Sequence, residues 1–294
     1  MTTFADMLTL DAAGEGSWTG KPGPGVGKRM FGGHALAQAL MAACEAEPDA
    51  DRLPHSLHAH FLQPGDAREP MRYDVTTLGT GRSFARRRVE AMQVDRHVLT
   101  MTVSAQGDED GLSHAAAPPD IGDFDSARRA LEQWQDAQGN LRRLPVIGDL
   151  GLRPIEVVPA DAPSLFGDAP HPPGSAVWMR AREGGAVSPA MARAQLAYAS
   201  DILFLRNALL PHGVRPGEEG IQIASLDHAI WFHTTPDFGQ WHLLAGESPW
   251  AGKGRGLSRG HFFTEDGILV ATVTQENLMR VTGGRPAERL RERG

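Results

Sequence analysis

The feature that most constrains the fold is an order of secondary structure that occurs twice. In each half a helix candidate precedes a series of strand-like segments. The segments of the first half begin at Gly33, Ser56, Gly81 and Val98, and those of the second half at Pro189, Ser225, Gly254 and Ile268. A repeat of this kind predicts two similar domains, each with one helix and several strands.

The helix of the second half carries clear boundary signals at its start. Ser188 is a natural N-cap, Pro189 suits the first helical position, and no glycine interrupts the next twenty residues. The stretch LAYASDILFLRNALL is apolar over most of its circumference. We therefore predict a helix from Pro189 to Leu210 that other structure surrounds.

Turn signals and β-branched residues predict antiparallel strands around these helices, which makes an α+β protein. The expected organisation is an N-terminal domain over 1–106, a linker with a short helix over 107–150 and a C-terminal domain over 151–283. The charged end, 284–294, is expected to be a mobile tail.

Composition excludes several classes of protein. The formal charge of −7 argues against a nucleic-acid partner, and the single cysteine, Cys44, excludes a scaffold of internal disulfides. The first residues lack the pattern of a signal peptide, and no apolar run reaches the about 20 residues that span a bilayer. We expect a cytoplasmic protein with no membrane span.

Four segments together are more specific than any short motif: FGGHALAQAL, YASDILFL, IASLDHAIWFH and RGHFFTEDGILVATVTQENLMR. From about Ala12 to Arg280 the chain resembles the acyl-CoA thioesterase II family. The resemblance implies a double hotdog fold, two antiparallel sheets each wrapped around a long central helix. It also implies an enzyme that hydrolyses acyl-CoA to a free acid and CoA without cofactor, metal or covalent intermediate. We expect a homo-oligomer, a dimer or a tetramer.

In the family, an Asp, a hydroxyl and a Gln hold the catalytic water. The matching motifs YASD, IASLDH and TVTQE assign these roles to Asp201, Ser225 and Gln275. Two other interpretations stay open from the residues alone: Asp201 could be exposed or paired with Arg206, and Gln275 could be an ordinary polar residue at a strand end.

Five residues are candidates for substrate binding. Gly32, Gly33 and His34 precede the first helix, where backbone N–H groups can face an anionic oxygen, although a tight turn explains the same residues. Arg82 and Arg255 occupy matching Gly-Arg positions in the two halves and could contact the phosphates of CoA, although arginines on exposed strands are common.

Two serine motifs suggest a nucleophile and are rejected. Ser225, Asp227 and His228 are too close along one strand to align as a triad. Ser258 lies in GLSRG, which has the letters of a nucleophile elbow, but the following HFFTEDGILVATV predicts a hairpin instead of the helix that the elbow needs.

Two further motifs favour ordinary structure over ligand binding. His58 and His60 share one face of a strand, but no Cys pair or H-E-x-x-H motif supports a metal site. The segment GKPGPGVGKR lacks the spacing of a phosphate-binding loop.

Two other functions are compatible with the predicted fold. Hotdog proteins include enoyl-CoA hydratases and dehydratases, which pair a histidine with a carboxylate, and His34 keeps this alternative open. A non-catalytic acyl-CoA-binding protein is the second alternative, which an exposed Asp201 would favour.

Overall fold

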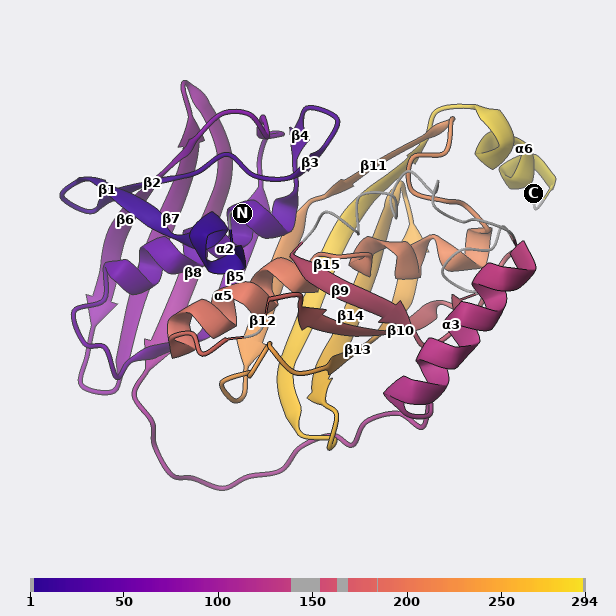
Figure 1. Cartoon of the computed structure of the whole chain (residues 1–294). Coiled ribbons are helices and arrows are strands. Elements are labelled where there is room, and N and C mark those ends of the chain that lie inside the picture. Colours follow the sequence, from indigo (N-terminus) through magenta and orange to yellow (C-terminus); the bar gives the residue numbers. More distant parts are fainter. Residues whose placement is uncertain (1–2, 139–153, 163–168, 184, 293–294) are drawn as a thin grey trace.

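Both halves of the chain contribute to one antiparallel sheet in the computed structural model, which Figure 1 shows. The structure describes residues 3–138, 154–162, 169–183 and 185–292. The elements of the first half are α1 (Phe4–Leu8), β1 (Leu10–Gly14), β2 (Ser17–Gly20), β3 (Gly25–Val26), β4 (Arg29–Met30), α2 (Gly32–Glu45), β5 (Leu53–Phe61), β6 (Met71–Thr80), β7 (Phe84–Gln93) and β8 (Arg96–Gln106).

The elements of the second half are α3 (Phe124–Gln138), β9 (Ile155–Pro159), β10 (Gly174–Ala181), α5 (Pro189–Ser200), the 3-10 helices η2 (Phe204–Ala208) and η3 (Leu210–His212), β11 (Ile221–Ser225), β12 (Asp227–Phe232), β13 (His242–Gly252), β14 (Arg255–Thr264), β15 (Leu269–Val281) and α6 (Gly284–Glu292). Between β8 and α3, the described residues form no helix or strand.

The sheet has the same strand order in each half. The order is β1-β2-β6-β7-β8-β5 and then β12-β15-β14-β13-β10-β9, with β11 also paired to β15. The halves join where β5 meets β12, with Ser56 opposite Trp231 and His60 opposite Asp227. The centre is therefore formed by β5, the first strand after α2, and β12, the second strand after α5. The repeat in the sequence becomes a twofold-like arrangement in space.

Helices α2 and α5 lie on the same face of this sheet (Figure 1). Eleven of the 14 residues of α2 and ten of the 12 of α5 are buried. Leu40 of α2 and Leu196 of α5 belong to one hydrophobic core that spans both halves. Both helices are alanine-rich, which favours the helical state and lets them approach each other closely. The predicted α+β architecture with two buried helices is confirmed.

Helix α5 is shorter than the sequence predicts. It ends at Ser200, and the chain turns at Leu203, whose φ of 63° lies in the left-handed region. The apolar pattern does continue to Leu210, but as the 3-10 helices η2 and η3. The prediction of one helix to Leu210 was wrong because hydrophobic burial alone does not distinguish a helix from a buried irregular segment.

The C-terminal end also differs from expectation. The structure places α6 in the segment that we expected to be a mobile tail. The Nε of Arg285 lies 2.6 Å from Glu218 Oε1, and Pro286 is buried. Residues 293–294 and all of the expected linker after Gln138, residues 139–150, lie outside the described residues.

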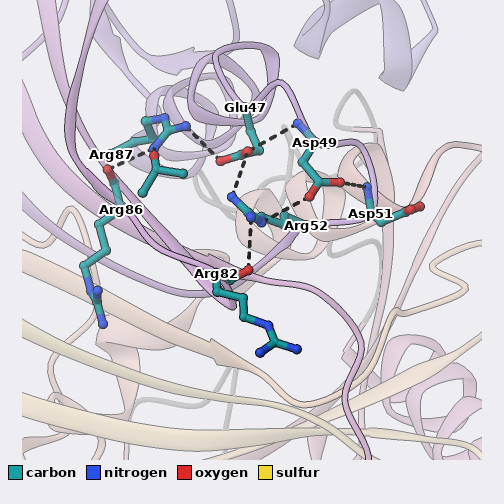
Figure 2. Close-up of polar contacts among 8 residues, drawn as sticks. Glu47, Asp49, Asp51, Arg52, Arg82, Arg86 and Arg87 are labelled. Carbon is teal, nitrogen blue, oxygen red and sulfur yellow. Dashed lines mark hydrogen bonds and ion pairs between the residues drawn. The ribbon is translucent and has the colours of Figure 1, made fainter.

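A buried ion pair fixes the C-terminal end of α2. Arg87, on the inner face of β7, places its Nη2 2.9 Å from Glu47 Oε2, and both side chains are almost fully buried. Arg52 lies 3.8 Å from the other oxygen of Glu47 and donates to the carbonyl of Arg82 (Figure 2). This network ties the end of α2 to the sheet.

We predict that Arg87→Met lowers the free energy of unfolding by about 3–5 kcal/mol, because it leaves a buried carboxylate with one fewer cation. Urea denaturation measures the change. The double variant Arg87→Met/Glu47→Gln should lose less than the single variant. Arg72→Met, which removes an exposed pair with Asp74, is the control and should cost less than about 1 kcal/mol. Equal losses in Arg87→Met and Arg72→Met would contradict the prediction.

Candidate active site

Asp201 joins the two halves at the end of α5. It is the C-cap residue of α5 and is 7% exposed, and its Oδ2 accepts a hydrogen bond of 2.8 Å from the Gly33 N–H of α2. The N-cap residue of α2, Phe31, offers no side-chain cap. The carboxylate of one helix therefore caps the N-terminus of the other, where the backbone N–H groups and the helix dipole favour negative charge.

The two glycines at the start of α2 allow this approach. A Cβ atom on Gly32 would lie 2.7 Å from Asp201 Oδ2, and one on Gly33 would lie 2.4 Å from the Tyr198 carbonyl oxygen. Both distances are too short for any larger residue without a shift of the carboxylate or of α5. The Gly-Gly pair is thus required by close packing of the helix ends.

Ser225 and Gln275 reach the same carboxylate from the sheet. Gln275 of β15 donates from Nε2 to Asp201 Oδ1 at 2.9 Å and to Ser225 Oγ at 2.6 Å. Ser225, at the end of β11, donates to Asp201 Oδ1 at 3.5 Å. The structure brings all three side chains together, with Gln275 fully buried. It also places Gln275 in the interior of β15 and not at a strand end, because β15 continues to Val281.

The three groups form one hydrogen-bonded cluster in which Ser225 can still donate its proton elsewhere. Asp201 Oδ1, Ser225 Oγ and Gln275 Nε2 lie within hydrogen-bond distance of one another, and the 3.5 Å contact from Ser225 is long enough for its O–H to turn to another acceptor. Beside them, the Gly32 N–H has no acceptor among the described residues. The site thus combines a carboxylate, a hydroxyl, an amide and a backbone donor.

The other three predicted binding residues contact groups other than Asp201, Ser225 and Gln275. His34 is fully buried, and its Nε2 lies 3.2 Å from the Lys21 carbonyl oxygen. Burial lowers the pKa of its imidazole, so the ring is neutral at pH 7. Arg82 lies in the turn between β6 and β7, near the opposite end of α2. Arg255 forms a 3.5 Å ion pair with Glu276 at the start of β14. Their roles in substrate binding stay predictions.

The rejected motifs are also placed by the structure. Ser258 lies within β14, between β13 and β15, so GLSRG is not a strand-to-helix elbow. His58 is on the sheet surface, packed edge-on against Trp231. Among the described residues, no group of three or more His, Cys, Asp or Glu side chains could hold a metal ion, and no helix is long and apolar enough to cross a membrane.

Two features of this region were not predicted from the sequence. The Gly33 amide was expected to face substrate, but it binds Asp201. His228, fully buried on β12, places its Nε2 2.8 Å from Ser200 Oγ, directly before Asp201. The resemblance pointed to Asp201, Ser225 and Gln275 but not to these contacts around them. Two sequence signals could have revealed the contact between Asp201 and Gly33. One is the carboxylate of Asp201 after an apolar helix, and the other is a helix that starts with Gly-Gly and lacks a capping side chain.

Comparison with known proteins identifies the family. The profile described as "Acyl-CoA thioesterase N-terminal domain" matches residues 20–106, and "Acyl-CoA thioesterase C-terminal domain" matches residues 122–279. The chain is 36% identical to acyl-CoA thioesterase 2 of Haemophilus influenzae, over 86% of this chain and 88% of that protein. The chain belongs to the acyl-CoA thioesterase family.

Solved structures agree with the assignment. Acyl-CoA thioesterase II TesB2 from Mycobacterium marinum aligns with this thioesterase at a TM-score of 0.72 and 33% identity, covering 94% of this chain and 97% of that one. A hot dog fold protein from Alicyclobacillus acidocaldarius aligns at a TM-score of 0.72 and 22% identity, over 95% of this chain and 98% of that one. The predicted double hotdog fold is confirmed.

We predict that His228 makes the thioesterase acid-sensitive. Burial lowers the pKa of His228 to about 3, from an ordinary value of 6.5. Between these two values the unfolded chain binds a proton that the folded chain excludes. The resulting stability is therefore present above about pH 6.5 and is lost as the pH falls toward 3, by up to about 1.4 kcal/mol per pH unit.

Urea denaturation from pH 7 to pH 4 tests this. His228→Gln should show a shallower loss of stability with falling pH, whatever its stability at pH 7, and the exposed His60→Gln is the control. Parallel curves for the wild type and His228→Gln would show that His228 does not titrate in this way.

Proposed function

We propose that this chain hydrolyses acyl-CoA thioesters by direct attack of water at the site formed by Asp201, Ser225 and Gln275. The observation that carries the proposal is the convergence of these three side chains at the start of α2. Membership of the acyl-CoA thioesterase family supplies the reaction class. An acyl-CoA is therefore the substrate, and a homo-oligomeric state stays a prediction.

In the proposed mechanism Asp201 is the general base. The carboxylate accepts a proton from the water as the water oxygen bonds to the thioester carbon. Ser225 and Gln275 orient this water and the carboxylate, which a buried base needs because its position sets the rate of proton transfer. The C–S bond then breaks, the thiolate of CoA takes up a proton, and Asp201 is ionised again when it gives up the proton that it accepted.

The start of α2 is the proposed site for the developing oxyanion. The Gly32 N–H lies next to the Asp201 carboxylate, at the positive end of the helix dipole. A preorganised backbone donor at this position stabilises the tetrahedral intermediate. Phe61 closes the same region, since its ring would lie 3.2 Å from a Cβ on Gly32. It provides an apolar surface beside the reacting carbon.

Asp201→Asn should lower kcat by about 10²–10⁴-fold, because it removes the base. Asn is also a good helix cap, so the fold should persist. Release of CoA thiol from acyl-CoA substrates of several chain lengths measures the activity, and a thermal melt measures the fold. Asp108→Asn, in the exposed linker, is the control. Turnover near the wild-type rate in Asp201→Asn would overturn the proposal.

Ser225 separates the water mechanism from a covalent one. If Ser225 only positions water, Ser225→Thr should keep most activity, because the hydroxyl remains, and Ser225→Ala should lose about 10–1000-fold. A serine nucleophile would instead give a burst of CoA and an acyl-enzyme. Mass spectrometry of rapidly quenched enzyme should find no acyl group on Ser225 or on Ser258. An acyl adduct on either serine would rule out direct hydrolysis.

A further inference from the structure

Ser258 is a buried hydroxyl that neither the fold nor the proposed mechanism uses. It lies in the middle of β14 and is 0% exposed, and its Oγ has no hydrogen-bond partner within the described part of the chain. A buried polar group without a partner costs about 1–3 kcal/mol. We therefore expect the Ser258 hydroxyl to have a hydrogen-bond partner that a small side-chain movement can bring within reach.

Gln275 is the residue directly opposite. Ser258 and Gln275 are a cross-strand pair of β14 and β15, which places their side chains next to each other on the inner face of the sheet. The Nε2 of Gln275 donates to Asp201 and Ser225, but its Oε1 is buried with no partner in the regions that the structure describes. Gln275 Oε1 can thus accept a hydrogen bond, and the Ser258 hydroxyl on the neighbouring strand can donate one.

The amide of Gln275 needs a contact at its oxygen end. The two ends of a glutamine amide have the same shape, so rotation by 180° would exchange them. That rotation would remove both N–H bonds and turn the carbonyl oxygen toward the Asp201 carboxylate. A donor to Oε1 would add to this preference for the productive orientation, because it would lose its acceptor in the rotated one.

We propose that Ser258 is this donor, a positioning residue whose hydroxyl holds Gln275 Oε1, directly or through one water, and thereby keeps Nε2 on Asp201 and Ser225. The proposal rests on the function proposed above for Gln275. Its chemistry is a single O–H···O hydrogen bond within the active-site wall. The serine of GLSRG then serves the reaction without being a nucleophile.

Asn277 extends the same row of polar groups. It follows Gln275 on the inner face of β15 and is 0% exposed, and neither atom of its amide has a partner among the described residues. Its Nδ2 would lie 3.3 Å from a Cβ on Gly256, two residues before Ser258. Asn277 therefore lies beside this pair on the same wall.

The test compares Ser258→Ala with Ser258→Thr, which keeps the hydroxyl, and Ser258→Cys, a weak donor of similar size. The matched control is Ser248→Ala, a buried serine of β13 whose Oγ donates to the Leu257 carbonyl. Ser258→Ala should lower kcat about 3- to 10-fold, the effect of one hydrogen bond, and leave KM within about twofold. Ser258→Thr should restore most of the loss, and Ser258→Cys should be intermediate.

The pH profile separates a positioning role from a structural one. If the Gln275 amide turns, the Asp201 carboxylate loses an N–H donor, and a carboxylate that loses such a donor is protonated at higher pH. The acid limb of kcat/KM should therefore move to higher pH in Ser258→Ala but not in Ser248→Ala. An unchanged kcat and acid limb in Ser258→Ala would overturn the inference.

A double variant shows whether the effect passes through Gln275. Gln275→Ala should lower kcat strongly, and adding Ser258→Ala should lower it no further. Independent, multiplicative losses would overturn the inference and leave the proposed function intact. Full activity in Gln275→Ala would instead overturn the proposed role of Gln275, and with it the inference about Ser258.

Discussion

The hydrogen bond between the Asp201 carboxylate and the Gly33 amide connects most features of this protein. It joins the C-terminal end of α5 to the N-terminal end of α2, and thus the two halves of the chain. A cap normally comes from the residue before a helix. Here it comes from 168 residues further along, so the site exists only when both halves are folded and docked.

The chain becomes irregular directly after this contact. In a regular helix to Leu210, Asp201 would be an interior residue of the helix. Instead α5 ends at Ser200, Asp201 is its C-cap, and Leu203 adopts the left-handed conformation. A left-handed, non-glycine residue costs about 1–2 kcal/mol. The buried hydrogen bonds on Asp201 and the burial of Phe204 and Leu209 offset that cost.

The sequence predicted the repeat and the buried helices, because these depend on apolar periodicity. Long motifs in order pointed to Asp201, Ser225 and Gln275, which the structure brings together. It did not predict the end of α5, because the apolar pattern continues to Leu210 and does not distinguish a helix from a buried irregular segment. The hydrogen bond from the Gly33 amide to Asp201 was not predicted, since a free N–H at a helix start does not reveal which anion reaches it. Arg82 and Arg255 occupy matching positions of the repeat, but one lies in each half of the chain. The match therefore did not indicate how far either arginine lies from Asp201.

Because the two halves are similar, the repeat relates the Asp201–Gly33 contact to a second position in the fold. Within the described part of the chain, that position lacks a carboxylate bound to a helix N-terminus. Helices α2 and α5 run in opposite directions, since Gly33 lies by Tyr198 and Cys44 is close enough to Arg193 to interact electrostatically. The start of α5 and the end of α2 are therefore the counterparts of the site.

At that counterpart, the first residue of α5 is Pro189, which has no N–H, and Ser188 caps the helix from its own side chain through the Met191 N–H. The acidic residue after α2, Glu47, is held by Arg87 and Arg52. Because Pro189 has no N–H, the first residue of α5 cannot donate a backbone hydrogen bond to an oxyanion. The Glu47 carboxylate is already bound by the guanidinium groups of Arg52 and Arg87. Among the described residues, the same supersecondary structure thus places the proposed catalytic carboxylate at one end of the helix pair and a structural ion pair at the other.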